Sequence, residues 1–272
     1  MDARPIVFLS DYGLEDEFVG ICHAVMVRIS PASRIVDLSH AVPPQDVLRG
    51  ALTLHRGIGY LPAEAVILAV VDPGVGTPRR PVALETVRRG RLLVGPDNGV
   101  LSLAWAEEGG VANAVEITSP DVILEPVSRT FHGRDIFAPA AAHLARGTTL
   151  GELGPPVDPA SLVGLALPRA GVEPGQIDGE VLSVDRFGNV QLSARHEDLE
   201  AAGLDRSAEL RLIALEGSTP VRRVATFGEV LEGEFGLIVD STGWLALVIN
   251  RGSAAEALGL AAGDPVTVRA LT

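Results

Sequence analysis

The sequence predicts an α/β N-terminal domain with a mainly parallel sheet, followed by a smaller all-β domain that forms an antiparallel, barrel-like sheet. Up to about residue 150, short β-branched runs alternate with longer helical stretches, which is typical of a parallel sheet covered by helices. From about residue 178, short apolar runs are separated by tight turn signals, as in small barrels. We therefore expect domains over 1–160 and 178–272, joined by a linker over 161–177.

Strands of the first domain are expected where apolar, mostly β-branched runs occur. The runs are 5–10, 33–38, 65–71, 81–86, 90–95 and 113–118. Two apolar stripes between or after them recur every three or four residues, the spacing of one buried helix face. The first stripe is Phe18, Cys22, Val25, Met26 and Ile29. The second stripe is Ile136, Phe137, Ala140, Ala141 and Leu144.

The second half of the chain is read as six short strands with tight turns between them. Before it, residues 151–177 are rich in Pro and Gly and lack a sustained period, which is typical of a linker. Near the end, the segment GSAAEALGLAAGDPVTV predicts a short helix, a Gly-Asp turn and a strand. The six runs are GEVLSVD, NVQLSA, AELRLIAL, GLIVD, WLALVIN and PVTVRAL.

Composition excludes several classes of function. The formal net charge is −13, and basic residues form no cluster beyond short pairs such as Arg222-Arg223, so no nucleic-acid partner is expected. Apolar runs fall short of the roughly 18 residues of a membrane span, and the first residues lack the features of a signal peptide. We expect a cytoplasmic protein without a membrane partner. The single cysteine, Cys22, excludes an intrachain disulfide and favours a buried structural thiol.

Three predicted strands run into Asp-x-Gly turns, at Asp11, Asp72 and Asp97. The ligand crevice of an open α/β sheet lies beyond the carboxyl ends of its strands, so we expect these carboxylates to converge there. A single Asp before a turn glycine is usually a turn residue, but three at successive strand ends favour a functional site. Arg79 follows Asp72 by seven residues.

The segment TFHGRD carries a candidate proton-transfer residue, His132, beside Arg134 and Asp135. His132 can exchange a proton near neutral pH, and Arg134 and Asp135 could form a fixed ion pair. The alternative is that all three are a helix N-cap with its surface charges. Asp and His at strand ends also suit a divalent-metal hydrolase, but the local pair His132 and Asp135 does not force that interpretation.

A second candidate segment is SVDRFGNVQLS, with Asp185, Phe187 and Asn189. It could be an ordinary hairpin turn with Asn189 in a left-handed conformation. Alternatively, the phenylalanine supplies an aromatic face for a base ring and the asparagine amide supplies a donor and an acceptor. Familiar glycine-rich motifs of dinucleotide, P-loop and serine-hydrolase sites do not occur in the sequence.

Six motifs in a fixed order resemble one family. They are LSDYGLEDEFVG, VVDPGVGT, GPDNGVL, TFHGRD, VDRFGNVQLS and DSTGWLALVINRGSAAE. Together they resemble the S-adenosylmethionine hydrolases, also called S-adenosylmethionine hydroxide adenosyltransferases, which are relatives of the fluorinase and chlorinase. The resemblance implies cleavage of S-adenosylmethionine by water to adenosine and methionine, without a metal or other cofactor. It also implies a homotrimer with active sites between the N-terminal domain of one subunit and the C-terminal domain of the next.

The resemblance also implies roles for individual residues. The catalytic set falls on Asp72, Arg79 and His132. Asp11 matches a carboxylate that binds the ribose hydroxyls. The residues expected near the methionine moiety are Asp16, Asp185 and Ser241, and those expected near adenine are Phe187, Asn189, Phe227 and Asn250.

Three alternatives to metal-free hydrolysis of S-adenosylmethionine stay open from the sequence. One is a chlorinase-like halogenase, although the resemblance implies that fluorinase-like relatives lack the equivalents of Asp72 and His132, which favours water as the nucleophile. The second is a non-catalytic protein that binds adenosine or S-adenosylmethionine. The third is the metal-dependent hydrolase.

Overall fold

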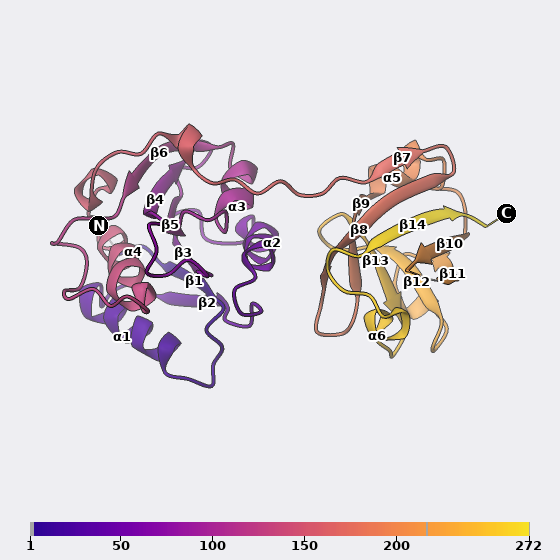
Figure 1. Cartoon of the computed structure of the whole chain (residues 1–272), viewed down its shortest axis with the longest axis horizontal. Coiled ribbons are helices and arrows are strands. Elements are labelled where there is room, and N and C mark those ends of the chain that lie inside the picture. The colour runs from indigo at the N-terminus through magenta and orange to yellow at the C-terminus, as the bar shows by residue number, and fades with distance from the viewer. Residues whose placement is uncertain (1–2, 216, 272) are drawn as a thin grey trace. The chain divides into compact units, whose positions relative to one another are not determined.

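The structure, a computed structural model, describes residues 3–215 and 217–271. The chain divides between Leu165 and Ala166 into two compact units (Figure 1), here called the N-unit and the C-unit. The division falls inside the segment 161–177 that is expected to be a linker, and so does a short strand, β7 (Gly171–Glu173). Among the described residues, no helix is long and apolar enough to cross a membrane.

One sheet forms the centre of the N-unit. In pairing order its described strands are β2 (Ile35–Ser39), β1 (Ile6–Ser10), β3 (Val66–Val70), β5 (Leu92–Pro96), β4 (Pro81–Thr86) and β6 (Val111–Glu116). The pairs β1–β2, β1–β3 and β3–β5 are parallel, whereas β4 is antiparallel to both β5 and β6. The mainly parallel sheet predicted from the sequence is confirmed, and each predicted strand overlaps an observed one.

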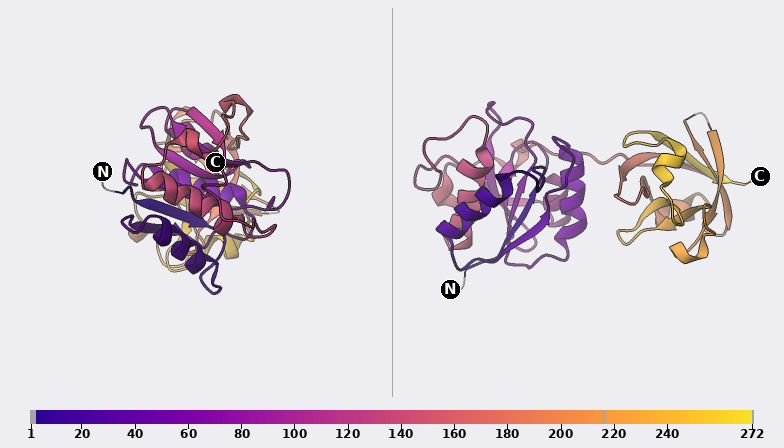
Figure 2. Two further views of the ribbon diagram at one scale, coloured as in Figure 1. Left: turned by 90° about the vertical axis from the view of Figure 1, so that its left-hand side faces the viewer. Right: turned by 90° about the horizontal axis from the view of Figure 1, so that it is seen from below.

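Helices cover both faces of this sheet (Figure 2). The described helical segments of the N-unit are α1 (Phe18–Ile29), α2 (Val47–Ile58), α3 (Ser102–Glu107), the π-helical turn η1 (Gly133–Phe137), α4 (Ala138–Ala145), and the 3-10 turns η2 (Leu150–Leu153) and η3 (Pro159–Ser161). Alternate residues of a strand point to opposite faces. Ile6 and Phe8 therefore join the core beneath α1 and α4, while Val7 and Leu9 join the core beneath α2 and α3.

The two predicted helical stripes are largely confirmed. Cys22, Val25 and Met26 of α1 are buried, and every member of the second stripe is buried in η1 or α4. Ile29 is partly buried against the same core, and Phe18 is the exception, because it is 38% exposed and lines a pocket described below. Burial raises the pKa of the Cys22 thiol to about 12, which fits the expected structural role.

The C-unit is a closed β-barrel, which confirms the barrel-like expectation. In pairing order its described barrel strands are β14 (Pro265–Ala270), β10 (Glu209–Ala214), β11 (Gly217–Arg223), β12 (Phe235–Val239), β13 (Trp244–Ile249), β9 (Val190–Arg195) and β8 (Gln176–Val184), and β8 pairs with β14 to close the ring. Strand β7 extends the sheet beside β8. The described helical segments of the C-unit are α5 (His196–Ala201), α6 (Ala254–Leu258) and the 3-10 turn η4 (Phe227–Glu229).

Two features of the barrel differ from the expectation. The β11–β12 pair is parallel, because the chain between these strands passes through η4 instead of a tight hairpin. Strand β11 is not among the predicted runs, because it carries Gly217 and Pro220, residue types that are depleted in strands. Pro220 is tolerated on the β12 side because only Arg222 and Arg223 pair with that strand.

Candidate active site

Asp11, Asp72 and Asp97 lie just beyond β1, β3 and β5, three neighbouring parallel strands. The prediction that they emerge at one edge of the sheet is therefore confirmed. Both carboxylate oxygens of Asp97 are nevertheless already hydrogen-bonded within the protein. One accepts from Arg80 Nε at 2.9 Å and the other from the backbone N–H of Val163 at 2.8 Å. The expectation that all three converge on one ligand crevice is thus wrong for Asp97.

Asp72 forms a bidentate pair with Arg79. Arg79 Nε donates to Asp72 Oδ1 at 3.1 Å, and Arg79 Nη2 donates to Asp72 Oδ2. Only 8% of the Arg79 side chain and 6% of the Asp72 side chain is exposed, so little solvent weakens the pair. The Arg79 guanidinium also lies 5.1 Å from the ring centre of Phe137, which fixes its plane.

The turn between these two residues depends on a glycine. Gly76 has φ +75°, and a Cβ at this position would lie 2.4 Å from the backbone carbonyl oxygen of Arg129. Only glycine combines that conformation with so close an approach. Thr77 Oγ1 donates to the carbonyl of Gly74 at 2.6 Å and closes the turn. The Pro-Gly motif therefore returns the chain so that Arg79 meets Asp72.

His132 completes the array. Arg79 Nη2 lies 3.1 Å from His132 Nδ1. A guanidinium donates hydrogen bonds and does not accept them, so Nδ1 is the acceptor and neutral His132 carries its hydrogen on Nε2. Burial, together with the positive charge of Arg79, lowers the pKa of His132, and Asp72 partly opposes this shift. The imidazole is therefore neutral at pH 7.

Asp11 lies beside this array and is held by a backbone donor. Its Oδ2 accepts from the backbone N–H of Gln45 at 2.8 Å, and Gln45 has φ +67°. Burial raises the pKa of Asp11, the charge of Asp72 raises it further, and the Gln45 hydrogen bond opposes the shift. Two neighbouring carboxylates thus share one edge of the site.

A pocket of about 280 Å³ opens among these residues. Tyr12 and Phe18 form an aromatic wall with Phe131: the Phe18 and Phe131 ring centres are 5.2 Å apart at 88°, and each ring lies 5.9 Å from Tyr12. A Cβ on Gly133 would lie 2.1 Å from Tyr12 Oη, so glycine lets the wall approach η1. The lining residues are Asp11, Tyr12, Phe18, Pro44, Gln45, Asp72, Val75, Thr130, His132 and Gly133.

The structure brings Asp11, Asp72 and His132 together around this pocket, with Arg79 behind Asp72. Asp16 is exposed in the bend before α1. Sequence reasoning missed Phe18 as a pocket residue because its helical spacing predicts burial. It also missed Gln45, since no sequence signal marks a glutamine with positive φ. Tyr12 stands inside the Asp-Tyr-Gly motif, which could have drawn attention to it.

The expected Arg134–Asp135 ion pair is confirmed, with Nε 2.6 Å from Oδ1. Asp135 is 2% exposed and also accepts from the backbone N–H of Ser128 at 2.8 Å. These partners hold the segment that carries His132. They also occupy the Asp135 carboxylate, which disfavours His132 and Asp135 as a pair of metal ligands.

In the C-unit, Asp185 organises the predicted turn. Its Oδ1 accepts from the backbone N–H groups of Phe187 at 2.8 Å and Asn189 at 2.9 Å, and its Oδ2 accepts from Asn189 Nδ2 at 2.7 Å. The left-handed residue is Gly188, with φ +80°, so the expectation that Asn189 takes this conformation is wrong. Phe187 is 69% exposed at the tip.

The other predicted C-unit residues lie in η4 and at the two ends of β13. Asn250 Nδ2 donates to the backbone carbonyl of Val230 at 2.8 Å, and Phe227, 47% exposed, begins η4. Ser241 precedes β13 and Asn250 follows it, so the length of that strand separates them. Asn250 therefore lies beside the end of η4, whereas Ser241 lies at the opposite end of β13.

Comparison with known proteins gives the family. The model of the SAM hydroxide adenosyltransferase N-terminal domain matches residues 6–154, and the model of the corresponding C-terminal domain matches residues 179–267. The chain belongs to the SAM hydroxide adenosyltransferase family.

Several individual proteins resemble this chain along nearly its whole length. A Salinispora tropica protein named (R)-S-adenosyl-L-methionine hydrolase is 51% identical over 265 residues, which cover 97% of each chain. A protein of Actinoplanes sp. (strain N902-109) named fluorinase is more distant, at 31% identity over 98% of each chain. A crystal structure of an uncharacterized conserved protein from Thermotoga maritima superposes with a TM-score of 0.89 at 35% identity, covering 97% of this chain and 99% of that one.

Proposed function

We propose that this chain hydrolyses S-adenosyl-L-methionine to adenosine and L-methionine by attack of water at the ribose C5′ atom. The observation that carries the proposal is the buried array of Asp72, Arg79 and His132 beside a pocket, in a member of this family. The Salinispora tropica relative is named for the (R) form of the substrate, and we propose the same form here.

The proposed reaction is a displacement at a saturated carbon. The water oxygen forms a bond to C5′ while the C5′–sulfur bond breaks, and the bonding electron pair leaves with sulfur as the neutral thioether of methionine. The leaving group therefore needs no proton. The attacking water becomes positively charged and must release a proton to a base.

Asp72 is the proposed proton acceptor. The bidentate contact with Arg79 holds its carboxylate in one orientation. The His132 Nδ1 lone pair already accepts from Arg79, so His132 acts as a positioning residue that fixes the guanidinium. A carboxylate paired with arginine is a weak base, but a water molecule that is bonding to carbon is a strong acid. Orientation of water, C5′ and sulfur would contribute much of the rate, on the order of 7–11 kcal/mol.

Asp11 is proposed to accept hydrogen bonds from the ribose hydroxyls, because Gln45 fixes its carboxylate at the pocket. The remaining assignments follow the family resemblance. We propose no metal and no other cofactor for the reaction, since Arg79 already supplies the positive charge beside Asp72. The proposed methionine contacts are Asp16, Asp185 and Ser241, and the proposed adenine contacts are Phe187, Asn189, Phe227 and Asn250.

A homotrimer with active sites between subunits is part of the proposal. The pocket of about 280 Å³ is below the 300–1,000 Å³ of most sites for small molecules, so a second surface is needed to enclose this substrate. Phe187 is 69% exposed at the tip of a turn, so its ring is free to stack against a ligand held by another subunit. We propose that the C-unit of a neighbouring subunit supplies this surface.

The test is product analysis in water enriched in oxygen-18, with each epimer of S-adenosyl-L-methionine supplied separately. The proposal predicts adenosine with the heavy isotope in its 5′-hydroxyl group, formed faster from the (R) epimer. The absence of any product would favour a binding protein. Formation of 5′-chloro-5′-deoxyadenosine in the presence of chloride would favour a halogenase, and activity that EDTA abolishes and a metal ion restores would favour a metal-dependent hydrolase.

A further inference from the structure

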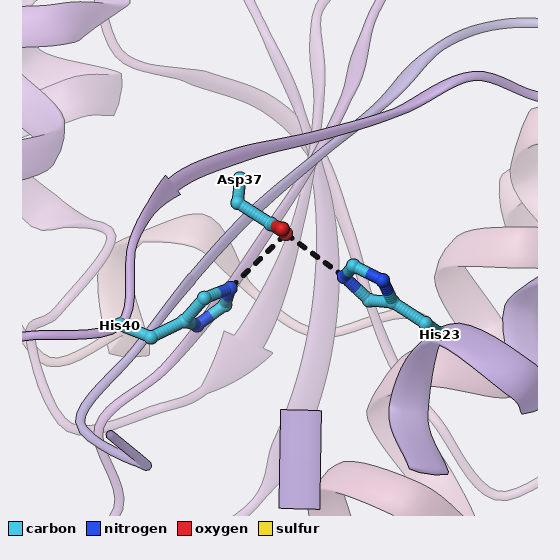
Figure 3. A group of neighbouring side chains, drawn as sticks. All are labelled: His23, Asp37 and His40. Atoms are coloured by element: carbon cyan, nitrogen blue, oxygen red, sulfur yellow. Dashed lines mark hydrogen bonds and ion pairs between the residues drawn. The ribbon is translucent and has the colours of Figure 1, made fainter. Parts of the chain in front are cut away.

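Two histidines and an aspartate that have no part in the proposed chemistry converge at the edge of the N-unit sheet. His23 lies on α1, Asp37 lies in the edge strand β2, and His40 follows that strand. Figure 3 shows both rings turned toward the same carboxylate. His23 Nε2 is 2.9 Å and His40 Nε2 is 3.0 Å from Asp37 Oδ1. The three donor atoms all lie within 4.8 Å of one another.

We propose that His23, Asp37 and His40 form a binding site for a divalent first-row transition-metal ion, with Zn²⁺ as the ion to test. Imidazole nitrogens and a carboxylate oxygen are a common donor set for such ions. Zinc bonds to these atoms at about 2.0–2.2 Å, so an ion at the centre of the three donor atoms can reach each of them after small side-chain shifts.

The orientation of the His40 ring favours metal coordination over a simple hydrogen bond to Asp37. Its side chain is 2% exposed, and its Nε2 atom has no hydrogen-bond partner of acceptable geometry among the described residues, although Asp37 Oδ1 is only 3.0 Å away. The ring nitrogen therefore does not point along the line to the oxygen. An ion bound by both atoms lies off that line, so this misalignment fits a shared metal ion.

A hydroxyl behind His40 fixes the ring. His40 Nδ1 lies 2.7 Å from Ser10 Oγ, and Ser10 is fully buried. Metal-binding histidines usually have their second nitrogen held in this way, which sets the tautomer and the ring orientation. When Ser10 accepts the hydrogen on Nδ1, the Nε2 lone pair is free for the metal. On the outer side, Asp37 is 42% and His23 31% exposed, which leaves room for an ion to enter and for water as a fourth ligand.

The site would stabilise the neighbouring loop rather than carry out chemistry. The backbone carbonyl of His40 accepts from the N–H of Gly13 at 2.8 Å, and Ser10 directly precedes Asp11. A bound ion would therefore join α1 and β2 to the loop that carries Asp11. It would leave Asp72 and His132 untouched, so this inference and the proposed function can fail independently.

The test measures Zn²⁺ binding to the full chain after chelator treatment and dialysis, by competition with a chromogenic chelator and by metal analysis. We expect one Zn²⁺ per chain, with affinity reduced by at least about 10²-fold in His23→Ala and in Asp37→Asn, because each removes one of three ligands. Ser10→Ala should cost about 10–100-fold, the usual effect of losing such a supporting group. Circular dichroism establishes that each variant is folded.

His196→Ala is the matched control, because His196 forms a comparable exposed contact with Glu200 at 3.5 Å on α5 and should bind Zn²⁺ like the wild type. Co²⁺ gives a second readout, since its visible spectrum reports imidazole and carboxylate coordination. Zn²⁺ should also raise the melting temperature of the wild type but not of His23→Ala. Equal Zn²⁺ affinity in wild type and His23→Ala, or no binding by the wild type, would overturn the proposal.

Discussion

Two aspartate–arginine pairs lie at neighbouring strand ends of the N-unit, and only one of them belongs to the pocket. Asp72 follows β3 and pairs with Arg79, while Asp97 follows β5 and pairs with Arg80. Both carboxylates are nearly buried, at 6% and 3% exposure. Both also belong to the same Asp-x-Gly motif. Residue type, burial and arginine pairing are therefore insufficient to distinguish a reactive carboxylate from a structural one.

The difference lies in the remaining partners. Asp97 accepts from the backbone N–H of Val163, and Arg80 donates to the backbone carbonyl of Ser161 at 2.7 Å. This pair ties the end of η3 and the residues that follow it to the sheet. The Asp72 pair instead contacts His132, and Asp72 lines the pocket. A buried ion pair at a strand end is therefore available for chemistry when it borders a ligand pocket. When backbone groups of another segment cover it instead, its role is structural.

The largest expected effect comes from neutralising each carboxylate in turn. Asp72→Asn should lower kcat for hydrolysis by about 10²–10⁴-fold, the usual loss when a general base is removed. Asp97→Asn should leave kcat nearly unchanged and lower the free energy of unfolding by about 1–3 kcal/mol, because it weakens a charged hydrogen bond. Steady-state kinetics and urea unfolding measure the two effects. Equal activity loss in both variants would remove the proposed distinction.

The pocket beside Asp72 is proposed to be completed by the C-unit of a neighbouring subunit. If so, co-expression of Asp72→Asn with Phe187→Ala should restore activity that each variant lacks alone. In a cyclic oligomer each site would combine the N-unit of one chain with the C-unit of the next. Random assembly of equal amounts would make both parts intact in roughly a quarter of the sites. Activity of the purified mixture and light-scattering mass measure this. Recovery no greater than the mean of the separate variants would contradict sites shared between subunits.

Much of the fold was predictable because its signals are local. The apolar runs that became β1, β3 and β5 each stand beside a turn motif, and parallel pairing then brings Asp11 and Asp72 to one edge. Strand β11 was not predictable in the same way, because Gly217 and Pro220 contradict strand composition although the strand forms a tight hairpin with β10.

The site was predictable only in part, since long-range contacts decide it. The Asp-x-Gly pattern alone does not separate Asp97 from Asp72, and only the family resemblance singles out Asp72. The backbone N–H of Val163, which covers the Asp97 carboxylate, comes from 66 residues away. Phe18 has the spacing of a core residue, yet it lies on the first turn of α1, where the helix borders the pocket. Local patterns identify candidate residues, whereas tertiary packing decides which of them face a ligand.

A smaller effect is expected from changing the arginines. Arg79→Lys should lower kcat by about 10–10²-fold, because lysine cannot reproduce a bidentate contact with Asp72 while also donating to His132. Arg80→Lys removes the equivalent geometry at Asp97 and should affect stability alone, since the partners of Arg80, Asp97 and Ser161, do not line the pocket. Kinetics and thermal unfolding of the two variants provide the comparison. An unchanged kcat in Arg79→Lys would show that the planar guanidinium is dispensable.

The smallest effect is expected from pH. Burial and Arg79 lower the pKa of His132, so the ring stays neutral below the ordinary value of about 6.5 and the acid limb of kcat should lie below that pH. Protonated His132 cannot accept from Arg79, and the array then loosens.

His143 on α4 is the control, because burial also lowers its pKa. Both histidines bind a proton more readily in the unfolded chain, so both make stability fall as pH decreases from about 6.5. His143→Gln should weaken the pH dependence of stability and leave the acid limb of kcat in place. His132→Gln should alter that limb. An acid limb of the wild type above pH 6.5 would contradict the assignment of His132.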